Sequence, residues 1–246
     1  MRRSWRSGAS QAPVSDEANG IEVRGLSKAL RGRTILTDVD LTVPRGTVAV
    51  MEGANGAGKT TFVRMLATVV SPDSGVARVN GYDVLDQSLD VRRSIGVSFA
   101  NERSLYWRIN GFENLELFGR IAGLSKRTIA ERSVSLLEEL HLAEVSRGQV
   151  ARMSTGQRQR LMVARALLTN PAVILLDEPF RGLDDEGLQA LTGLVARLAS
   201  SGLTALIVAP LIEAVLPIAD ATYRIEAGVI RSTRLERRSG PLVEQP

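Results

Sequence analysis

Short apolar runs recur along the chain, and their lengths predict strands buried in a sheet. Strands are expected at 35–43, 47–53, 76–80, 95–99, 173–177 and 204–209. The last four runs are β-branched or continuously apolar, which is typical of strands covered on both faces. Pro44, Arg45 and Gly46 form a turn signal between the first two, so these are expected to be antiparallel neighbours.

The pattern becomes helical between Phe112 and Leu168. Apolar positions recur there at three- and four-residue spacing through NLELFGRIAGL and RTIAERSVSLLEELHLA. The fold class predicted from these patterns is α/β, with a helical subdomain over about 105–168 inserted into the core. An antiparallel β subdomain is expected near the N-terminus.

One folded unit is predicted, over residues 21–231. The flanking stretches 1–20 and 232–246 are rich in Ser, Gly, Pro, Gln and Arg and lack hydrophobic periodicity, so both are expected to be flexible tails. No run of about 18 apolar residues is present, so no transmembrane helix is predicted. Any membrane role is expected to come through another chain.

Composition narrows the function classes only slightly. The chain has 31 Lys and Arg against 27 Asp and Glu, a formal net charge of +4, and much of the excess is Arg near the two ends. A small basic excess in tails is weak evidence for nucleic acid, and no nucleic-acid partner is expected. The sequence contains no cysteine, which excludes disulfides and thiolate metal sites.

The strongest chemical signal is the run GANGAGKT, which starts at Gly53. It matches G-x-x-x-x-G-K-[ST], follows a predicted strand and precedes a helical run. Small residues let the backbone wrap phosphates closely, while the helix N-terminus adds positive potential. Lys59 is expected to neutralise the β- and γ-phosphates of ATP, and the Thr60 hydroxyl to bind Mg²⁺. The predicted nucleotide-binding residues of this loop are Gly53, Ala54, Asn55, Gly56, Ala57, Gly58, Lys59, Thr60 and Thr61.

Two adjacent carboxylates end the apolar run at 173–177. Asp177 and Glu178 follow at the carboxyl end of the predicted strand, where ligands collect in open α/β sheets. Asp177 is predicted to hold Mg²⁺, directly or through water, and Glu178 to be the catalytic residue that polarises the attacking water.

A third motif, MSTGQRQRL, starts at Met153 and opens a helical run. The order of the three motifs resembles the ATP-binding cassette (ABC) family of P-loop ATPases, and the resemblance covers about residues 21–231. The segment around Ser104 looks like the subunits that serve ABC-2 type exporters. The resemblance implies a P-loop core of ABC type in a peripheral protein at the cytoplasmic face of the membrane.

The resemblance also implies two partners. One is a second ATP-binding subunit, identical or different, whose ATP is capped by the signature residues Ser154, Thr155, Gly156 and Gln157, with Asp184 as a polar contact between the two sites. The other is an integral membrane permease. Thr155 replaces the glycine that the family usually has.

Three further departures from the family pattern bear on turnover. The only histidine is His141, whereas the family places a switch histidine where this chain has Pro210. Ala100 or Asn101 stands where a lid glutamine is expected, and Leu30 stands where an aromatic residue usually stacks on adenine. These departures favour an alternative in which the chain is a catalytically weak subunit that completes a competent partner's site. A non-transport ABC-type ATPase is a second alternative.

Overall fold

The computed structural model describes residues 18–100, 104–210 and 212–233. The strands are β1 (Asn19–Leu30), β2 (Arg33–Pro44), β3 (Val48–Glu52), β4 (Ser74–Val79), β5 (Tyr82–Asp83), β6 (Ile95–Ser98), β7 (Val173–Asp177), β8 (Thr204–Ala209), β9 (Ala221–Glu226) and β10 (Val229–Thr233). The α-helices are α1 (Lys59–Leu66), α2 (Ser88–Ser94), α3 (Gly111–Ile121), α4 (Lys126–Glu139), α5 (Thr155–Leu167) and α6 (Asp185–Ser200). Short 3₁₀ helices are η2 (Val145–Arg147), η3 (Val150–Arg152) and η4 (Leu216–Ile218).

The strands form two sheets. The smaller sheet has the order β2-β1-β4-β5, and all of its pairs are antiparallel. The larger sheet has the order β10-β9-β3-β8-β7-β6, in which every pair except β9–β10 is parallel. The predicted α/β class with an antiparallel subdomain is therefore confirmed.

The prediction that the two strands around Pro44 are antiparallel neighbours is wrong. β2 lies in the smaller sheet, whereas β3 pairs with β8 and β9 in the larger one. Val48 to Met51 are all buried. A strand this apolar needs cover on both faces, which a central position in a parallel sheet provides. The chain therefore changes sheets at the turn instead of folding back.

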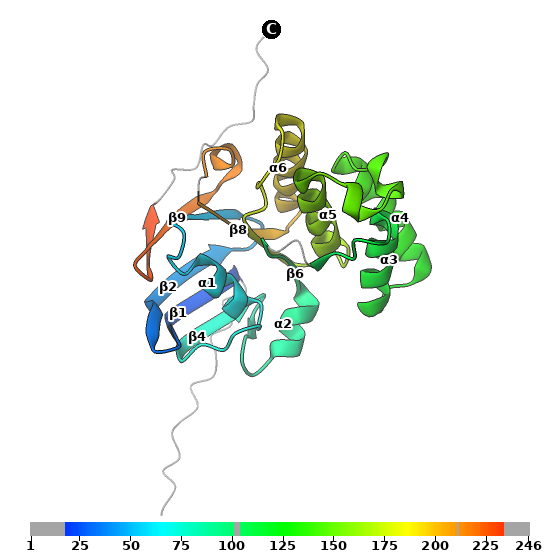
Figure 1. The fold of residues 1–246 in the computed structure, drawn as a ribbon. Coiled ribbons are helices and arrows are strands. Elements are labelled where there is room, and N and C mark those ends of the chain that lie inside the picture. Colours follow the sequence, from blue (N-terminus) through cyan, green and yellow to red (C-terminus); the bar gives the residue numbers. More distant parts are fainter. Residues whose placement is uncertain (1–17, 101–103, 211, 234–246) are drawn as a thin grey trace, which may run out of the picture.

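Alternate residues of the central strands enter two separate cores. Val50, Leu176 and Ile207 belong to the cluster that includes residues of α5 and α6. Met51 and Leu175 belong to the cluster that includes α1 and the antiparallel strands. Figure 1 shows this layering, with α1 and the antiparallel sheet to one side of the larger sheet and α3 to α6 to the other. Because side chains alternate between the two faces of each strand, β3, which leads into the GANGAGKT run, is packed between two apolar layers.

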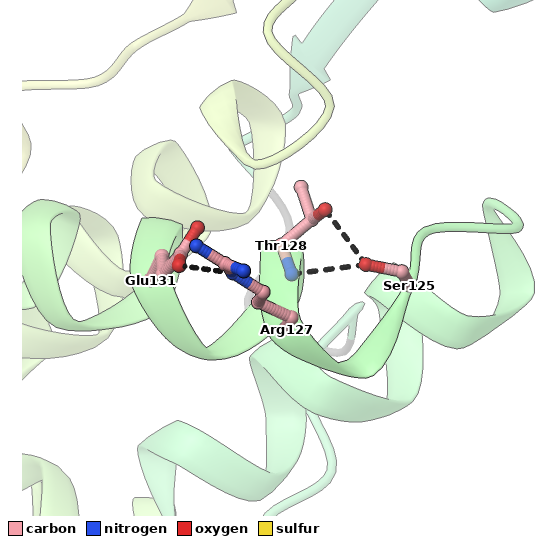
Figure 2. A network of polar contacts seen from close by, with 4 residues as sticks. All are labelled: Ser125, Arg127, Thr128 and Glu131. Atoms are coloured by element: carbon pink, nitrogen blue, oxygen red, sulfur yellow. Dashed lines mark hydrogen bonds and ion pairs between the residues drawn. The ribbon is translucent and has the colours of Figure 1, made fainter.

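The helices between 105 and 168 begin at local capping signals. Asn110 and Glu113 form a reciprocal capping box at the start of α3. The Ser125 hydroxyl accepts a hydrogen bond from the Thr128 backbone N–H at the start of α4, and Arg127 pairs with Glu131 one turn on (Figure 2). Such caps satisfy backbone donors that a helix N-terminus leaves unpaired.

The first and last elements that the structure describes are β1 and β10. β1 begins at Asn19 and β10 ends at Thr233. The predicted tails lie almost wholly outside the described residues. Within the residues that the structure describes, no helix is both long and apolar enough to cross a membrane.

Candidate nucleotide-binding site

The P-loop, which is the run GANGAGKT at residues 53–60, joins the end of β3 to the start of α1. Its geometry requires glycine at two positions. Gly58 caps α1 with a φ of 106°, a region that favours glycine. A Cβ at Gly53 would lie 2.5 Å from the Ile225 carbonyl oxygen. A side chain at either position would displace the backbone, so the loop keeps its shape only with glycine at both.

Lys59 is folded back over this loop. Its side chain donates hydrogen bonds to the carbonyl oxygens of Gly53, at 2.5 Å, and Ala54, at 2.9 Å, and the residue is 5% exposed. Burial lowers the pKa of the Lys59 ammonium, while the negative charges of Glu178 and Asp177 oppose that shift. The ammonium is thus held where the glycine backbone would surround a phosphate.

The carboxylate motif at Asp177 and Glu178 contacts the P-loop through a direct hydrogen bond. Thr60 Oγ1 donates to Asp177 Oδ2 over 2.8 Å. β3 and β7 both flank β8 in the parallel sheet, so their carboxyl ends lie at one edge. Burial raises the pKa of Asp177, despite the hydrogen bond from Thr60, and its second oxygen is buried without a hydrogen-bond partner.

Glu178 has an uncommon backbone conformation for a residue with a side chain, with a φ of 51°. Its N–H donates to the Val208 carbonyl over 2.7 Å, and its carbonyl accepts from Gln159 Nε2 over 3.3 Å. Gln159 is 2% exposed and comes from α5. The motif MSTGQRQRL contains Gln159 but assigned it no role, because its contact with Glu178 depends on how α5 packs.

The oxygens of Thr60 and Asp177 suit a magnesium ion. Mg²⁺ prefers oxygen ligands and is commonly bound by one or two side chains together with phosphate oxygens and water. The described residues contain no group of three or more His, Cys, Asp or Glu side chains arranged around one metal position. The oxygens of Thr60 and Asp177 would suit an ion whose other ligands are phosphate oxygens and water.

Comparison with known proteins identifies the family. The model of the ABC transporter family matches residues 36–181. The chain belongs to the ABC transporter family. The "Daunorubicin resistance ATP-binding protein DrrA3" of Streptomyces coeruleorubidus is 39% identical over 85% of this chain and 66% of that protein. The "ABC transporter ATP-binding protein NatA" of Bacillus subtilis (strain 168) is 36% identical over 78% of each.

Solved structures agree with the ABC assignment. The "Structure of ATP binding subunit of ABC transporter" superposes with a TM-score of 0.79 at 28% identity, over 87% of this chain and 90% of that one. A bacterial ABC transporter cassette solved as a dimer has the same fold, with a TM-score of 0.77 at 24% identity over 88% of this chain and 99% of that one. The protein thus has the fold of an ABC ATP-binding cassette.

The signature loop of this cassette is held by its own side chains. Ser154 and Gln157 form a reciprocal capping box at the start of α5, with Gln157 N–H to Ser154 Oγ at 3.1 Å and Ser154 N–H to Gln157 Oε1 at 2.9 Å. A Cβ at Gly156 would lie 2.4 Å from the Gly182 carbonyl oxygen. The signature loop therefore packs against the loop that follows Glu178, and Gly156 permits the close approach.

Asp184 ends that second loop as the N-cap of α6. Its carboxylate accepts a hydrogen bond from the Gly187 N–H over 2.9 Å. Capping fixes the position of Asp184 within its own subunit. A contact of Asp184 with the second ABC site remains a proposal.

The positions that depart from the ABC pattern lie at different places in the fold. Pro210 follows β8 and is exposed, and Leu30 is 40% exposed at the end of β1. His141 Nδ1 lies 2.6 Å from Glu186 Oε1, so the only histidine links the end of α4 to the start of α6. Ala100 is partly buried. Asn101 lies outside the described residues.

Proposed function

We propose that this protein is the ATP-binding subunit of an ABC-2 type exporter, acting at the cytoplasmic face of the membrane. It binds MgATP and hydrolyses it at the interface with a second ATP-binding subunit, which drives transport through a membrane permease. The observation that carries the proposal is the hydrogen bond between Thr60 and Asp177 beside Lys59. It joins the two sequence motifs and supports assigning them to one phosphate and metal site.

The roles follow from the charges at this site. The P-loop amides and Lys59 hold the phosphates, while Thr60 and Asp177 hold Mg²⁺, which would neutralise charge on the phosphate oxygens. Glu178, next to Asp177 and partly buried, polarises the attacking water. The backbone of Glu178, which has a positive φ, is held by the hydrogen bond from its N–H to Val208 and by the one that its carbonyl accepts from Gln159.

A second subunit completes the site. The N-terminus of α5 presents backbone donors, a geometry that favours the γ-phosphate bound to a partner. Gly156 would contribute its backbone N–H, and Ser154 and Gln157 their side-chain donors, because the N–H groups of Ser154 and Gln157 are engaged in the capping box. A bacterial cassette of the same fold forms a dimer, which supports this arrangement.

Export by a membrane partner is supported by the relatives and by an exposed aromatic surface. Relatives named for daunorubicin or doxorubicin resistance come from Streptomyces and from Mycobacterium tuberculosis. The chain spans 66% of the first of these proteins. Tyr106 and Trp107 are 54% and 44% exposed, and we assign the permease contact to them.

A weakly hydrolysing subunit is the second candidate. It is favoured by exposed Pro210 at the switch position, by Leu30 in place of an aromatic residue, and by the engagement of His141 with Glu186. The signature loop of such a chain would contact the ATP of a partner subunit that hydrolyses it. ATP binding would persist while turnover falls.

Steady-state ATP hydrolysis by the purified chain tests the proposal. Glu178→Gln should lower turnover by a factor of about 10² or more, because it removes the group that polarises water. Glu144→Gln, an exposed control at the start of η2, should leave turnover unchanged. Turnover that is insensitive to Glu178→Gln would contradict the assigned role. Binding without turnover would favour the second candidate.

A further inference from the structure

Two arginines of α5 contact aromatic rings, one of which is the exposed ring of Trp107. Arg158 and Arg165 are seven residues apart, so they share one face of the helix. The Arg158 guanidinium lies 5.2 Å from the centre of the Trp107 ring. The Arg165 guanidinium lies 4.6 Å from the centre of the Phe118 ring, and its Nη1 donates to the Ser104 carbonyl over 2.6 Å.

The backbone fastens the same segment to the residues that lead into the signature loop. The Ala151 N–H donates to the Trp107 carbonyl over 3.0 Å, and the Val150 N–H donates to the Ile109 carbonyl over 3.1 Å. Residues 150–152 form η3, which ends just before Met153. Trp107 therefore contacts both η3, which precedes α5, and Arg158 of α5 itself.

The other side of the Arg158 guanidinium contacts the signature loop. Its Nη1 donates to the Met153 carbonyl, next to the cap residue Ser154. Its Nη2 donates to Thr155 Oγ1 over 3.3 Å. Thr155, which replaces the usual glycine, also places its methyl group 3.1 Å from where a Cβ at Gly182 would lie. The Arg158 guanidinium thus contacts the exposed Trp107 ring, the signature residue Thr155, and Met153 just before the signature residues.

We propose that Arg158 is a positioning residue that ties Trp107 to the signature loop. The inference rests on the proposed function, in which the permease contacts Trp107 and a second subunit's ATP contacts the signature loop. A partner that moves the Trp107 ring would move the guanidinium, and with it Met153 and Thr155. The guanidinium is suited to this role because it stacks through its face while its edge donates fixed hydrogen bonds.

A purely structural role for Arg158 makes a different prediction. An arginine that only stabilises the start of α5 would act independently of the Trp107 ring. Loss of both side chains would then multiply their separate effects on turnover. Residues that work through one contact give a double variant about as slow as the slower single variant.

The test uses the full chain with Trp5→Phe, which leaves Trp107 as the only tryptophan. Arg158→Gln, Trp107→Ala and their double variant are compared in steady-state ATP hydrolysis and, where Trp107 remains, in tryptophan emission. Arg158→Lys keeps the positive charge but lacks the planar guanidinium. Arg152→Gln is the matched control, an exposed arginine in η3. Thermal unfolding confirms that each variant is folded.

We expect Arg158→Gln to shift Trp107 emission and to lower kcat by about tenfold or more, as for loss of a group that positions transition-state donors. KM should change less than about twofold, because the P-loop that binds ATP is untouched. Arg158→Lys should recover part of kcat, and the double variant should be no slower than the slower single one.

Two results would overturn the proposal, and they are distinguishable. In the first, the parent chain hydrolyses ATP, and the effects of Arg158→Gln and Trp107→Ala on turnover multiply in the double variant. That result would overturn this inference alone. A parent chain without turnover would overturn the hydrolytic function and this inference with it.

Discussion

We propose that Asp177 binds the metal and that its buried charge lowers stability, and Asp177→Asn should separate the two effects. The side chain is 1% exposed, and one of its oxygens is buried without a hydrogen-bond partner. Burial raises the pKa of this carboxyl despite the hydrogen bond from Thr60. The ionised form therefore destabilises the folded state at neutral pH. Asparagine has nearly the same shape, carries no charge and can still accept the Thr60 hydrogen bond.

The sign of the pH dependence follows from the raised pKa. A carboxyl whose pKa is higher in the folded state destabilises the protein fully above that folded pKa, and not at all below its unfolded value of about 3.9. We expect Asp177→Asn to raise the free energy of unfolding at neutral pH by about 0.5–2 kcal/mol, the range usual for relief of a functional site. The advantage should shrink as pH falls toward the unfolded pKa.

Thermal unfolding, followed by circular dichroism without nucleotide, measures this effect. A gain of about 1 kcal/mol would raise the unfolding midpoint by about 2–4 °C in a chain of this size. Asp86→Asn, an exposed control, should stay within about 0.5 kcal/mol. MgATP should stabilise the parent more than Asp177→Asn, since the variant lacks one of the two proposed metal ligands. A variant less stable than the parent at neutral pH, or a gain independent of pH, would refute the reasoning.

Three further substitutions test the loops and the core. Ser154→Ala should cost about 1 kcal/mol in chemical denaturation by removing the cap of α5, and an unchanged stability would contradict the capping box. Gly156→Ala should cost about 1–3 kcal/mol and lower ATP turnover, because its Cβ would lie 2.4 Å from the Gly182 carbonyl oxygen; normal stability and turnover together would show that the loop adjusts freely. Phe62→Ala, at a fully buried position in α1, should cost about 3–5 kcal/mol in the same denaturation assay, and a loss below 1 kcal/mol would show that α1 is loosely packed.

Local patterns were enough to place the central strands. β7 and β8 have the expected limits, 173–177 and 204–209, because each is a continuous apolar run bounded by turn residues. β1 was not predicted: its alternation is broken by register shifts, and Gly25 adopts a φ of 60°. β9 and β10 also escaped prediction, since their mixed polar and apolar residues acquire partners only when β3 is in place.

The motifs pointed to residues that the structure brings together, but not to the contacts that hold them. The spacing around Lys59 and the strand end at Asp177 are local features, so both could be proposed from the sequence alone. The hydrogen bond from Gln159 to Glu178 and the stacking of Arg158 on Trp107 depend on how α5 packs. No spacing rule links residues that far apart in the chain, and these contacts came only from the structure.

Equilibrium binding of MgATP to the purified chain tests the central claim most directly. The account predicts saturable binding that Lys59→Ala weakens by about tenfold or more, because it removes the buried ammonium that neutralises the phosphates. Lys126→Ala, an exposed position at the start of α4, should bind as the parent does. Equal affinity of the parent and Lys59→Ala for MgATP would contradict the assignment of the P-loop as the nucleotide site.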